Sequence, residues 1–203
     1  MTELIVALDK PESLALIPKL NVFAGVKFFK LDATTLLDPV SFEQVLYHLK
    51  LRKCDIFLDL KLYNTRDSVA RIAHEAFKAG ARFLTVFADP VMLQAAMEAK
   101  SDERQKVIAV GRMTDGSGRP VDSYISTYDG VVCSMDWAHY YSNKLRVCPG
   151  IRPAGWPSNN HSNPVTPREA RDAGVEYIVV GRPIYAAPDP IAAAKAIIEE
   201  LRP

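Results

Sequence analysis

An acidic and a basic side chain stand close together at the end of an apolar run in the segment "FLDLK" (57–61). Alternate side chains of a β-strand point to the same face of a sheet, so Asp59 and Lys61 would lie side by side. An ammonium fixed in this way stabilises negative charge that develops on a bound molecule and can then protonate it. The same spacing also suits a structural ion pair, which is the alternative interpretation.

Further polar residues end or interrupt other apolar runs. Asp9 follows the first run, Lys27 lies in the second, and Ser134 ends the sixth. Each alone has an ordinary explanation, because an aspartate after a strand is often a helix N-cap and a lysine can extend along an apolar surface to water. Lys30 competes with Lys27 for an inward position. Several charged side chains that meet at one place are nevertheless more typical of a functional site than of coincidence.

An anion-binding site is expected near the end of the chain. Gly181 and Arg182 directly follow the apolar run "YIVV" and precede the last helical stretch. Backbone N–H groups at such a position can point at an anion, and a guanidinium can bind two phosphate oxygens at once. The long segment 150–166, rich in Gly, Pro, Asn and Ser, could fold over the same ligand. We therefore predict a phosphate site here, with a plain surface role for Arg182 as the alternative.

The elements that must position these residues alternate regularly along the chain. Apolar runs rich in β-branched residues cover residues 4–8, 22–28, 54–60, 82–88, 106–110, 129–134, 145–148 and 177–181. Continuous apolar strands that alternate with helices predict a parallel sheet covered by helices. Eight such units favour a closed (β/α)8 barrel, the TIM barrel, and polar residues at its strand ends would meet at one mouth. We expect residues 1–203 to form this one domain.

Composition argues against several other classes of protein. The formal net charge of +1 indicates no nucleic-acid-binding surface, and no apolar run reaches the roughly 18 residues that span a bilayer. The start "MTELIVALDK" lacks an export signal, so a cytoplasmic protein is expected. Cys54, Cys133 and Cys148 are scattered and without metal-ligand spacing, which favours reduced core thiols over disulfides or a metal site.

Several motifs of the chain together resemble one enzyme family. The segments "VALD", "VK", "FLDLK", "DGVVCS", "CPGIRPAG", "VTP" and "GVEYIVVGRPIYAAPDP" occur in the order typical of orotidine 5′-phosphate decarboxylases, and the resemblance runs from about residue 4 to residue 201. It implies a homodimer with shared active sites that converts orotidine 5′-monophosphate to uridine 5′-monophosphate and carbon dioxide in pyrimidine biosynthesis. It also implies an enzyme without metal or cofactor, whose partners are this nucleotide and a second copy of the chain.

The resemblance further implies roles for individual residues. Around the reacting carbon, Asp59 would lie against the substrate carboxylate, Lys61 would lie beside the carbon that loses it, and Asn64 would reach the site from the partner subunit. The remaining implied contacts are those of Asp9, Lys27 and Ser68 with the ribose, of Ser134 and Pro149 with the pyrimidine, and of His161, Gly181 and Arg182 with the phosphate.

The chain departs from the family at its most diagnostic motif. The family reads D-x-K-x-x-D-I-P-N-T, whereas this chain reads D-L-K-L-Y-N-T-R-D-S. Asn64 therefore stands where the family has an aspartate, and Ser68 where it has a threonine. His161 takes the place of a usual glutamine, and "VFADP" lacks a usual histidine. Asp67 lies near the start of the next helix, where an acidic residue is favourable, so we expect it to be structural.

Three functions stay open at this point. An active decarboxylase with a divergent motif is favoured by Asp59, Lys61 and Arg182. A lyase of the same barrel suprafamily that acts on another phosphorylated substrate is the second, and a nucleotide-binding protein that has lost catalysis is the third. Asn64 favours the last two, because an amide keeps hydrogen bonding but removes the charge.

Overall fold

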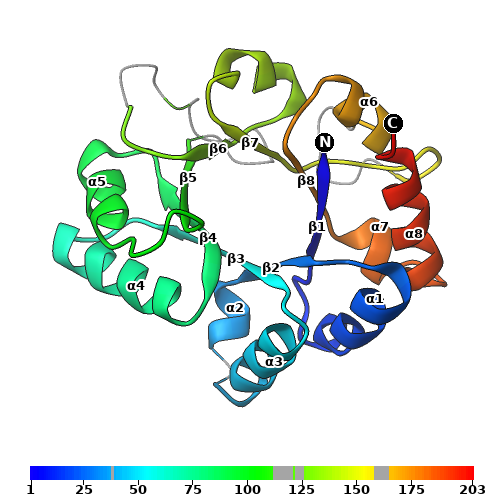
Figure 1. Cartoon of the computed structure of the whole chain (residues 1–203), viewed down its shortest axis with the longest axis horizontal. Coiled ribbons are helices and arrows are strands. Elements are labelled where there is room, and N and C mark those ends of the chain that lie inside the picture. Colours follow the sequence, from blue (N-terminus) through cyan, green and yellow to red (C-terminus); the bar gives the residue numbers. More distant parts are fainter. Residues whose placement is uncertain (38, 112–120, 122–125, 158–164) are drawn as a thin grey trace.

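A closed barrel of parallel strands forms the centre of the molecule (Figure 1). In the computed structural model, the described residues (1–37, 39–111, 121, 126–157 and 165–203) contain eight strands that pair in sequence order, and the last closes the barrel against the first. The strands are β1 (Glu3–Ala7), β2 (Phe28–Asp32), β3 (Asp55–Leu62), β4 (Ala81–Phe87), β5 (Lys106–Val110), β6 (Gly130–Val132), β7 (Leu145–Cys148) and β8 (Tyr177–Val180). The predicted (β/α)8 TIM barrel is therefore confirmed.

Helices surround the barrel (Figure 1). They are η1 (Pro11–Leu16), α1 (Ile17–Ala24), α2 (Ala33–Leu36), α3 (Pro39–Leu51), α4 (Arg66–Lys78), α5 (Pro90–Glu98), η2 (Met135–Tyr141), α6 (Pro167–Asp172), α7 (Arg182–Tyr185) and α8 (Pro190–Glu200), where η marks a 3₁₀ helix. Asp32, Asp89 and Asp189 each accept two backbone N–H groups at the start of α2, α5 and α8. Such caps satisfy N–H groups that the helix itself leaves free, and they set where these helices begin.

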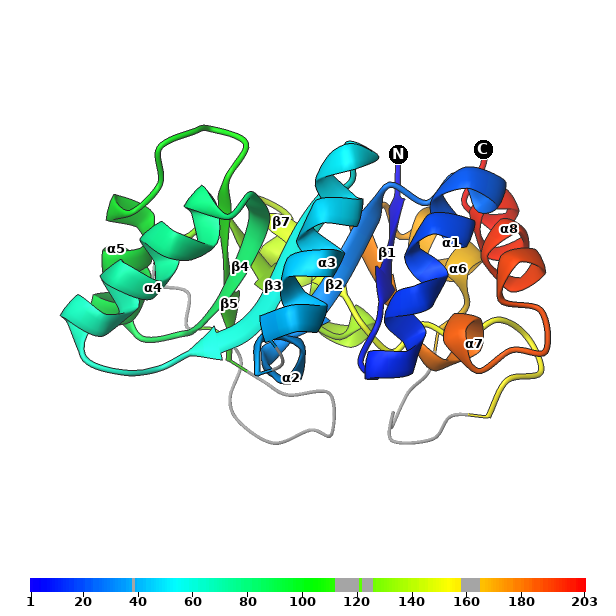
Figure 2. The ribbon, with the colours of Figure 1, turned by 90° about the horizontal axis from the view of Figure 1, so that it is seen from below.

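The side view shows which end of the barrel holds the carboxyl ends of the strands (Figure 2). β1 begins near the amino terminus at the upper edge and runs downward. The short helices α2 and α7, which directly follow β2 and β8, lie at the lower edge. In barrels of this class the active site is built at this carboxyl end.

Apolar side chains pack on both faces of the strands. One cluster lies between the strands and the helices, and the other fills the barrel interior, where Phe28 and Phe83 meet edge to face at 4.9 Å between ring centroids. Because both faces are buried, the strands have continuous apolar sequences rather than alternating ones.

An arginine closes the amino-terminal end of the barrel. The Arg82 guanidinium lies 5.3 Å from the centroid of the Phe28 ring and 5.9 Å from that of Tyr177. Its Nη1 donates to Asp55 Oδ2 at 2.6 Å. This end is therefore filled by a packed ion pair.

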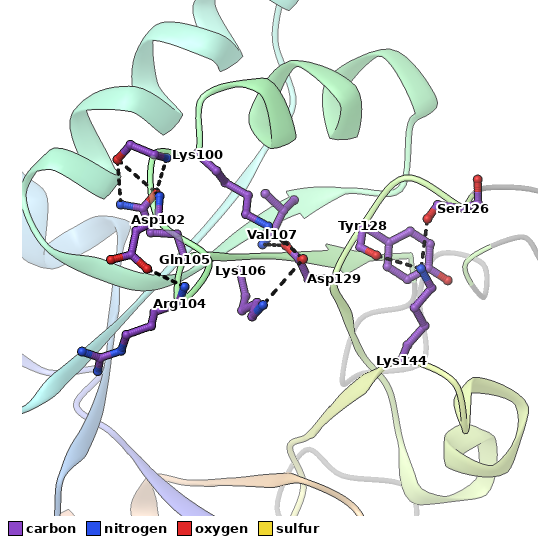
Figure 3. Close-up of polar contacts among 11 residues, drawn as sticks. Lys100, Asp102, Arg104, Gln105, Lys106, Val107, Ser126, Tyr128, Asp129 and Lys144 are labelled. Atoms are coloured by element: carbon purple, nitrogen blue, oxygen red, sulfur yellow. Dashed lines mark hydrogen bonds and ion pairs between the residues drawn. The ribbon is translucent and has the colours of Figure 1, made fainter.

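A second charged cluster joins β5 to β6 at the same end (Figure 3). Asp129, which precedes β6, accepts hydrogen bonds of 2.8 Å from Lys100 Nζ and from the backbone N–H of Val107. Lys144 donates to the carbonyl of Tyr128 at 2.8 Å and lies 4.2 Å from the centroid of its ring. These groups bind one another, and we assign them a structural role.

The second predicted strand is wrong in its position. Gly25 adopts a φ of 74° and ends α1, and β2 starts only at Phe28. A left-handed φ of this kind strongly favours glycine, which is why the helix ends there. The apolar run 22–28 therefore spans a helix end, a turn and the first residue of a strand. As a result, Lys27 precedes the strand and Lys30 lies within it.

Candidate active site

A cavity of about 360 Å³ opens at the carboxyl ends of the strands, a size suited to a small ligand. Apolar side chains form part of its wall, namely Phe57, Val110, Val132, Val147 and Val179. Its charged residues are Asp9 from the segment after β1, Lys30 and Asp32 from β2, Asp59 and Lys61 from β3, and Arg152 and Arg182 from the segments after β7 and β8. The cavity therefore has a carboxylate–lysine side and an arginine side.

Charges of alternating sign form a chain on the carboxylate–lysine side. Lys30 Nζ lies 2.8 Å from Asp9 Oδ1 and 3.3 Å from Asp59 Oδ2. Lys61 Nζ lies 2.8 Å from the same Asp59 oxygen. The side chains of Lys30 and Asp59 are each only 12% exposed, so the ion pair between them is shielded from solvent, whereas Lys61 is 32% and Asp9 41% exposed. In such surroundings the charges interact more strongly than they would in water.

The same contacts keep the Asp59 carboxylate and the Lys30 ammonium ionised. Burial alone would raise the pKa of the Asp59 carboxyl, but the charges of Lys30 and Lys61, with hydrogen bonds from Lys61 and Thr85, hold it below its ordinary value. Burial likewise would lower the pKa of Lys30, yet Asp59 and Asp9 outweigh that effect and raise it. Asp59 and Lys30 are therefore both charged at neutral pH.

A bulge in β3 places Asp59 and Lys61 beside each other. Leu58 pairs with Leu84 and Leu62 pairs with Val86, so three residues of β3 stand opposite Thr85 alone. Within this bulge Lys61 has a φ of 47°. A positive φ is uncommon for a residue with a side chain, and bulges often redirect side chains next to active sites.

Two guanidiniums form the arginine side of the cavity. Arg152 is buried, with 6% of its surface exposed, and its Nε finds no hydrogen-bond partner among the described residues. Burial and then the like charge of Arg182 lower the pKa of Arg152. A buried donor without a partner is costly, and an anion in the cavity would supply the missing acceptor and the opposite charge.

Gly181 allows a ligand to approach the backbone near this arginine side. A Cβ atom at this position would lie 3.4 Å from the Ala7 Cβ and 3.4 Å from Tyr185 Cε1, at the close end of ordinary van der Waals contact. A side chain would fill this part of the wall. The glycine keeps the backbone accessible beside Arg182.

The structure brings most of the predicted site residues together. The predicted residues that line the cavity are Asp9, Asp59, Lys61, Pro149, Gly181 and Arg182. Ser134 follows β6 at the same end of the barrel but is exposed and is not part of the cavity wall. His161 lies outside the described residues.

The assignment of Lys27 to the site is corrected by the structure. Lys27 is exposed, and its carbonyl accepts a hydrogen bond from the Asp55 N–H at the amino-terminal end of β3. It therefore lies at the opposite end of the barrel from the cavity. Lys30, three residues further on, contacts the two carboxylates instead. The error follows from the misplaced second strand.

Asn64 and Ser68 lie at a second hollow rather than in the cavity. A groove of about 550 Å³ runs along β3, α3 and α4, and its wall is mainly apolar. Phe42, Leu58, Leu60 and Ile72 belong to this wall, together with Asn64, Ser68, Arg71 and Glu75 at its polar positions. The Asn64 Oδ1 accepts from the Thr65 N–H at 2.7 Å.

Asp32, Arg152 and Thr85 were not predicted from the sequence. Asp32 stands two residues after Lys30 in "FFKLD", the same spacing that singled out Asp59 and Lys61, and this signal could have found it. Arg152 lies within the noted "PGIRP" segment but only its burial reveals its role. Thr85 lies in an apolar run and carries no sequence signal.

Predictions from the sequence also concern the cysteines, possible metal ligands and possible membrane spans. Cys54, Cys133 and Cys148 are buried free thiols, as predicted. The described residues contain no group of three or more His, Cys, Asp or Glu side chains that could hold a metal ion. Within the same described part of the chain, no helix is long and apolar enough to cross a membrane.

Comparisons with known proteins agree with the geometry. The sequence model of the orotidine 5′-phosphate decarboxylase / HUMPS family matches residues 2–197. An orotidine 5′-phosphate decarboxylase of Rhodopseudomonas palustris (strain BisA53) is 34% identical, with 98% of this chain and 94% of the relative covered. One of Moorella thermoacetica is 32% identical, with 98% and 92% covered. The crystal structure of orotidine 5′-phosphate decarboxylase from Lactobacillus acidophilus superposes with a TM-score of 0.75 at 28% identity, covering 99% of both chains. By its sequence and its barrel, the chain belongs to the orotidine 5′-phosphate decarboxylase / HUMPS family.

Proposed function

We propose that this protein decarboxylates orotidine 5′-monophosphate to uridine 5′-monophosphate and carbon dioxide, the carboxy-lyase step of pyrimidine biosynthesis in the cytoplasm. The observation that carries this proposal is the row of charges Asp9–Lys30–Asp59–Lys61, with its two central members largely buried, which faces a cavity with two guanidiniums on its other side. A ligand that develops a carbanion at one end and carries a phosphate at the other matches the carboxylate–lysine side and the arginine side of the cavity. Membership in the family supports the same assignment.

Lys61 is the proposed proton donor. When the bond between C6 of the pyrimidine and the carboxylate breaks, carbon dioxide leaves and the electron pair stays on C6. The Lys61 ammonium stabilises this charge, then gives C6 a proton and regains one from water. Asp59, 2.8 Å away, holds the ammonium in place and stands where the substrate carboxylate would approach.

The rest of the nucleotide is assigned to the remaining cavity residues. Arg182, Arg152 and the backbone at Gly181 would bind the phosphate, since guanidiniums match phosphate oxygens in geometry and charge. Asp9 and Lys30 would bind the ribose hydroxyls, with Lys30 in the role first expected of Lys27. Pro149 would line the pyrimidine pocket, with Ser134 beside it. His161 stays a proposed phosphate contact from the segment after β7.

We further propose that the protein acts as a homodimer with shared sites. The mainly apolar groove beside α4 is the surface that a second copy would cover, because large exposed apolar surfaces commonly mark interfaces. Asn64 and Ser68 at its polar positions would then reach the partner's site. The reaction is proposed to need no metal and no cofactor, with Lys30 supplying the positive charge between the carboxylates of Asp9 and Asp59.

A spectrophotometric assay with orotidine 5′-monophosphate tests the proposal. We expect turnover that a strong metal chelator does not reduce. Turnover of another phosphorylated substrate, dependent on added metal, would instead identify a different lyase of the suprafamily. Tight binding of uridine 5′-monophosphate without turnover would identify a nucleotide-binding homologue, which the neutral Asn64 favours.

A further inference from the structure

We propose that Thr85 is a positioning residue of the active site, whose single hydroxyl fixes both the carboxylate of Asp59 and the backbone of Lys61. This inference rests on the proposed decarboxylation. Thr85 is not part of the cavity wall, so it would act only through the two residues that it holds.

The hydroxyl makes one hydrogen bond in each direction. Thr85 Oγ1 donates to Asp59 Oδ1 at 2.9 Å and accepts from the Lys61 N–H at 2.8 Å. The hydroxyl proton is thereby directed at the carboxylate, and a lone pair is directed at the amide. Among the described residues, the Asp59 Oδ1 has this one donor, whereas its Oδ2 faces Lys30 and Lys61.

The bulge explains why a side chain has to supply these bonds. Between the pairs Leu58–Leu84 and Leu62–Val86, β4 offers only Thr85 opposite three residues of β3. The regular ladder is interrupted there, and the Lys61 N–H is satisfied by a hydroxyl in place of a backbone carbonyl. A buried N–H group without a partner would be costly.

Burial makes the arrangement rigid. Thr85 is 0% exposed and follows Phe83 by two residues, so its side chain points into the barrel like that of Phe83, which belongs to the interior cluster. A β-branched side chain in a packed strand has few rotamers available. The hydroxyl can therefore hold the carboxylate at one angle, and Asp59 in turn orients the ammoniums of Lys30 and Lys61.

Thr85→Val removes the hydroxyl with little change in shape, and Thr85→Ser keeps it. Thr2→Val is the matched control, because Thr2 is also buried and its hydroxyl donates to the Val175 carbonyl at 2.7 Å, away from the cavity. In Thr85→Val we expect kcat to fall about 10- to 100-fold, with KM for the nucleotide within about threefold of the parent. Thr85→Ser should recover most of kcat, and Thr2→Val should leave both constants unchanged.

A second measurement does not depend on turnover. The pKa of the Asp59 carboxyl, followed by carbon NMR in the ligand-free protein, should rise in Thr85→Val, because a donor that favours the ionised form is lost while Lys30 and Lys61 remain. It should stay at the parent value in Thr85→Ser and Thr2→Val. If the parent shows no turnover, the proposed function fails, and this titration still decides whether Thr85 holds Asp59.

The outcomes that overturn the inference are direct. They are a Thr85→Val variant with the kcat of the parent, or one in which the Asp59 pKa does not move. If Thr85→Val does not fold, Thr85→Cys replaces it, because a thiol keeps the volume but is a weak donor. A Thr85→Cys variant with the kcat and Asp59 pKa of the parent would also reject the role.

Discussion

Lys61 Nζ lies 2.8 Å from Asp59 Oδ2 although the backbone of Lys61 has a φ of 47°. Residues other than glycine rarely adopt this conformation, and it is concentrated at functional sites, where the surrounding structure enforces it. Here Lys61 lies in the bulge opposite Thr85. An ordinary surface ion pair would need no such distortion, which favours the catalytic interpretation of the pair over the structural one.

Replacement of Lys61 should separate chemistry from binding. In Lys61→Ala we expect decarboxylation to be abolished, because the proton donor and the charge that stabilises the carbanion are both lost. Calorimetry should still detect binding of uridine 5′-monophosphate, because the residues proposed to bind its phosphate lie on the arginine side of the cavity. Lys19→Ala, in α1, serves as a control that should keep the parent rate. Turnover near the parent rate in Lys61→Ala would mean that another group donates the proton.

Lys30 and Lys27 form a matched pair for testing the corrected site. Lys30→Met removes one of the two ion-pair partners of the largely buried Asp59 carboxylate. We therefore expect a large loss of kcat and a loss of about 3 kcal/mol in the free energy of unfolding. Lys27→Met, at an exposed position, should change that free energy by less than about 0.5 kcal/mol and leave kcat unchanged. Urea unfolding and the decarboxylation assay measure the two quantities, and the reverse pattern would restore Lys27 to the site.

Comparison of Lys30→Met with the parent should also reveal how the ion pairs make stability depend on pH. The lowered pKa of Asp59 gives stability that is present above its unfolded value and is lost as the pH falls through the folded value. The raised pKa of Lys30 gives stability that is present below its unfolded value of 10.5 and is lost as the pH rises through the folded one. The difference in unfolding free energy between the parent and Lys30→Met should therefore be flat from about pH 5 to about pH 9 and shrink outside this window. A difference that grows toward acid pH would contradict the ion-pair chain.

Arg182 should act on the phosphate alone. A charge-assisted hydrogen bond to phosphate contributes roughly 1.5–3 kcal/mol, so Arg182→Ala should raise KM for the nucleotide about 10- to 100-fold. Binding of the nucleoside without its phosphate should match that of the parent. Arg168→Ala, an exposed arginine of α6, is the control and should change neither value. An equal loss for nucleotide and nucleoside would place Arg182 outside the phosphate site.

The neutral residue at position 64 should limit the rate. On the proposed dimer, Asn64→Asp restores a carboxylate that repels the substrate carboxylate and helps to hold Lys61, so kcat is expected to rise. Asp67→Asn should lower stability slightly and leave kcat within about threefold, because the Asp67 side chain is 89% exposed in the first turn of α4 and lies 3.9 Å from Arg66. A collapse of kcat in Asp67→Asn, with Asn64→Asp silent, would show that the charge is supplied by Asp67.

The sequence by itself determined the architecture and the two ends of the site. Eight apolar runs separated by helical stretches suffice for a parallel barrel, because strands buried on both faces have this composition wherever they lie. Asp59, Lys61, Gly181 and Arg182 could be placed at the mouth because each stands at or directly after the end of a run, and strand ends of a parallel barrel converge.

Only the tertiary structure decided which of Lys27 and Lys30 enters the site. Side chains alternate between the two faces of a strand, so an error in where β2 begins changes which residues point inward, and the left-handed turn at Gly25 sets that start. The roles of Arg152 and Thr85 likewise could not be predicted from the sequence. The role of Arg152 depends on its burial beside Arg182, and that of Thr85 on a bulge in a neighbouring strand. Both properties arise from residues far apart in the chain, whereas sequence patterns report only on residues close together.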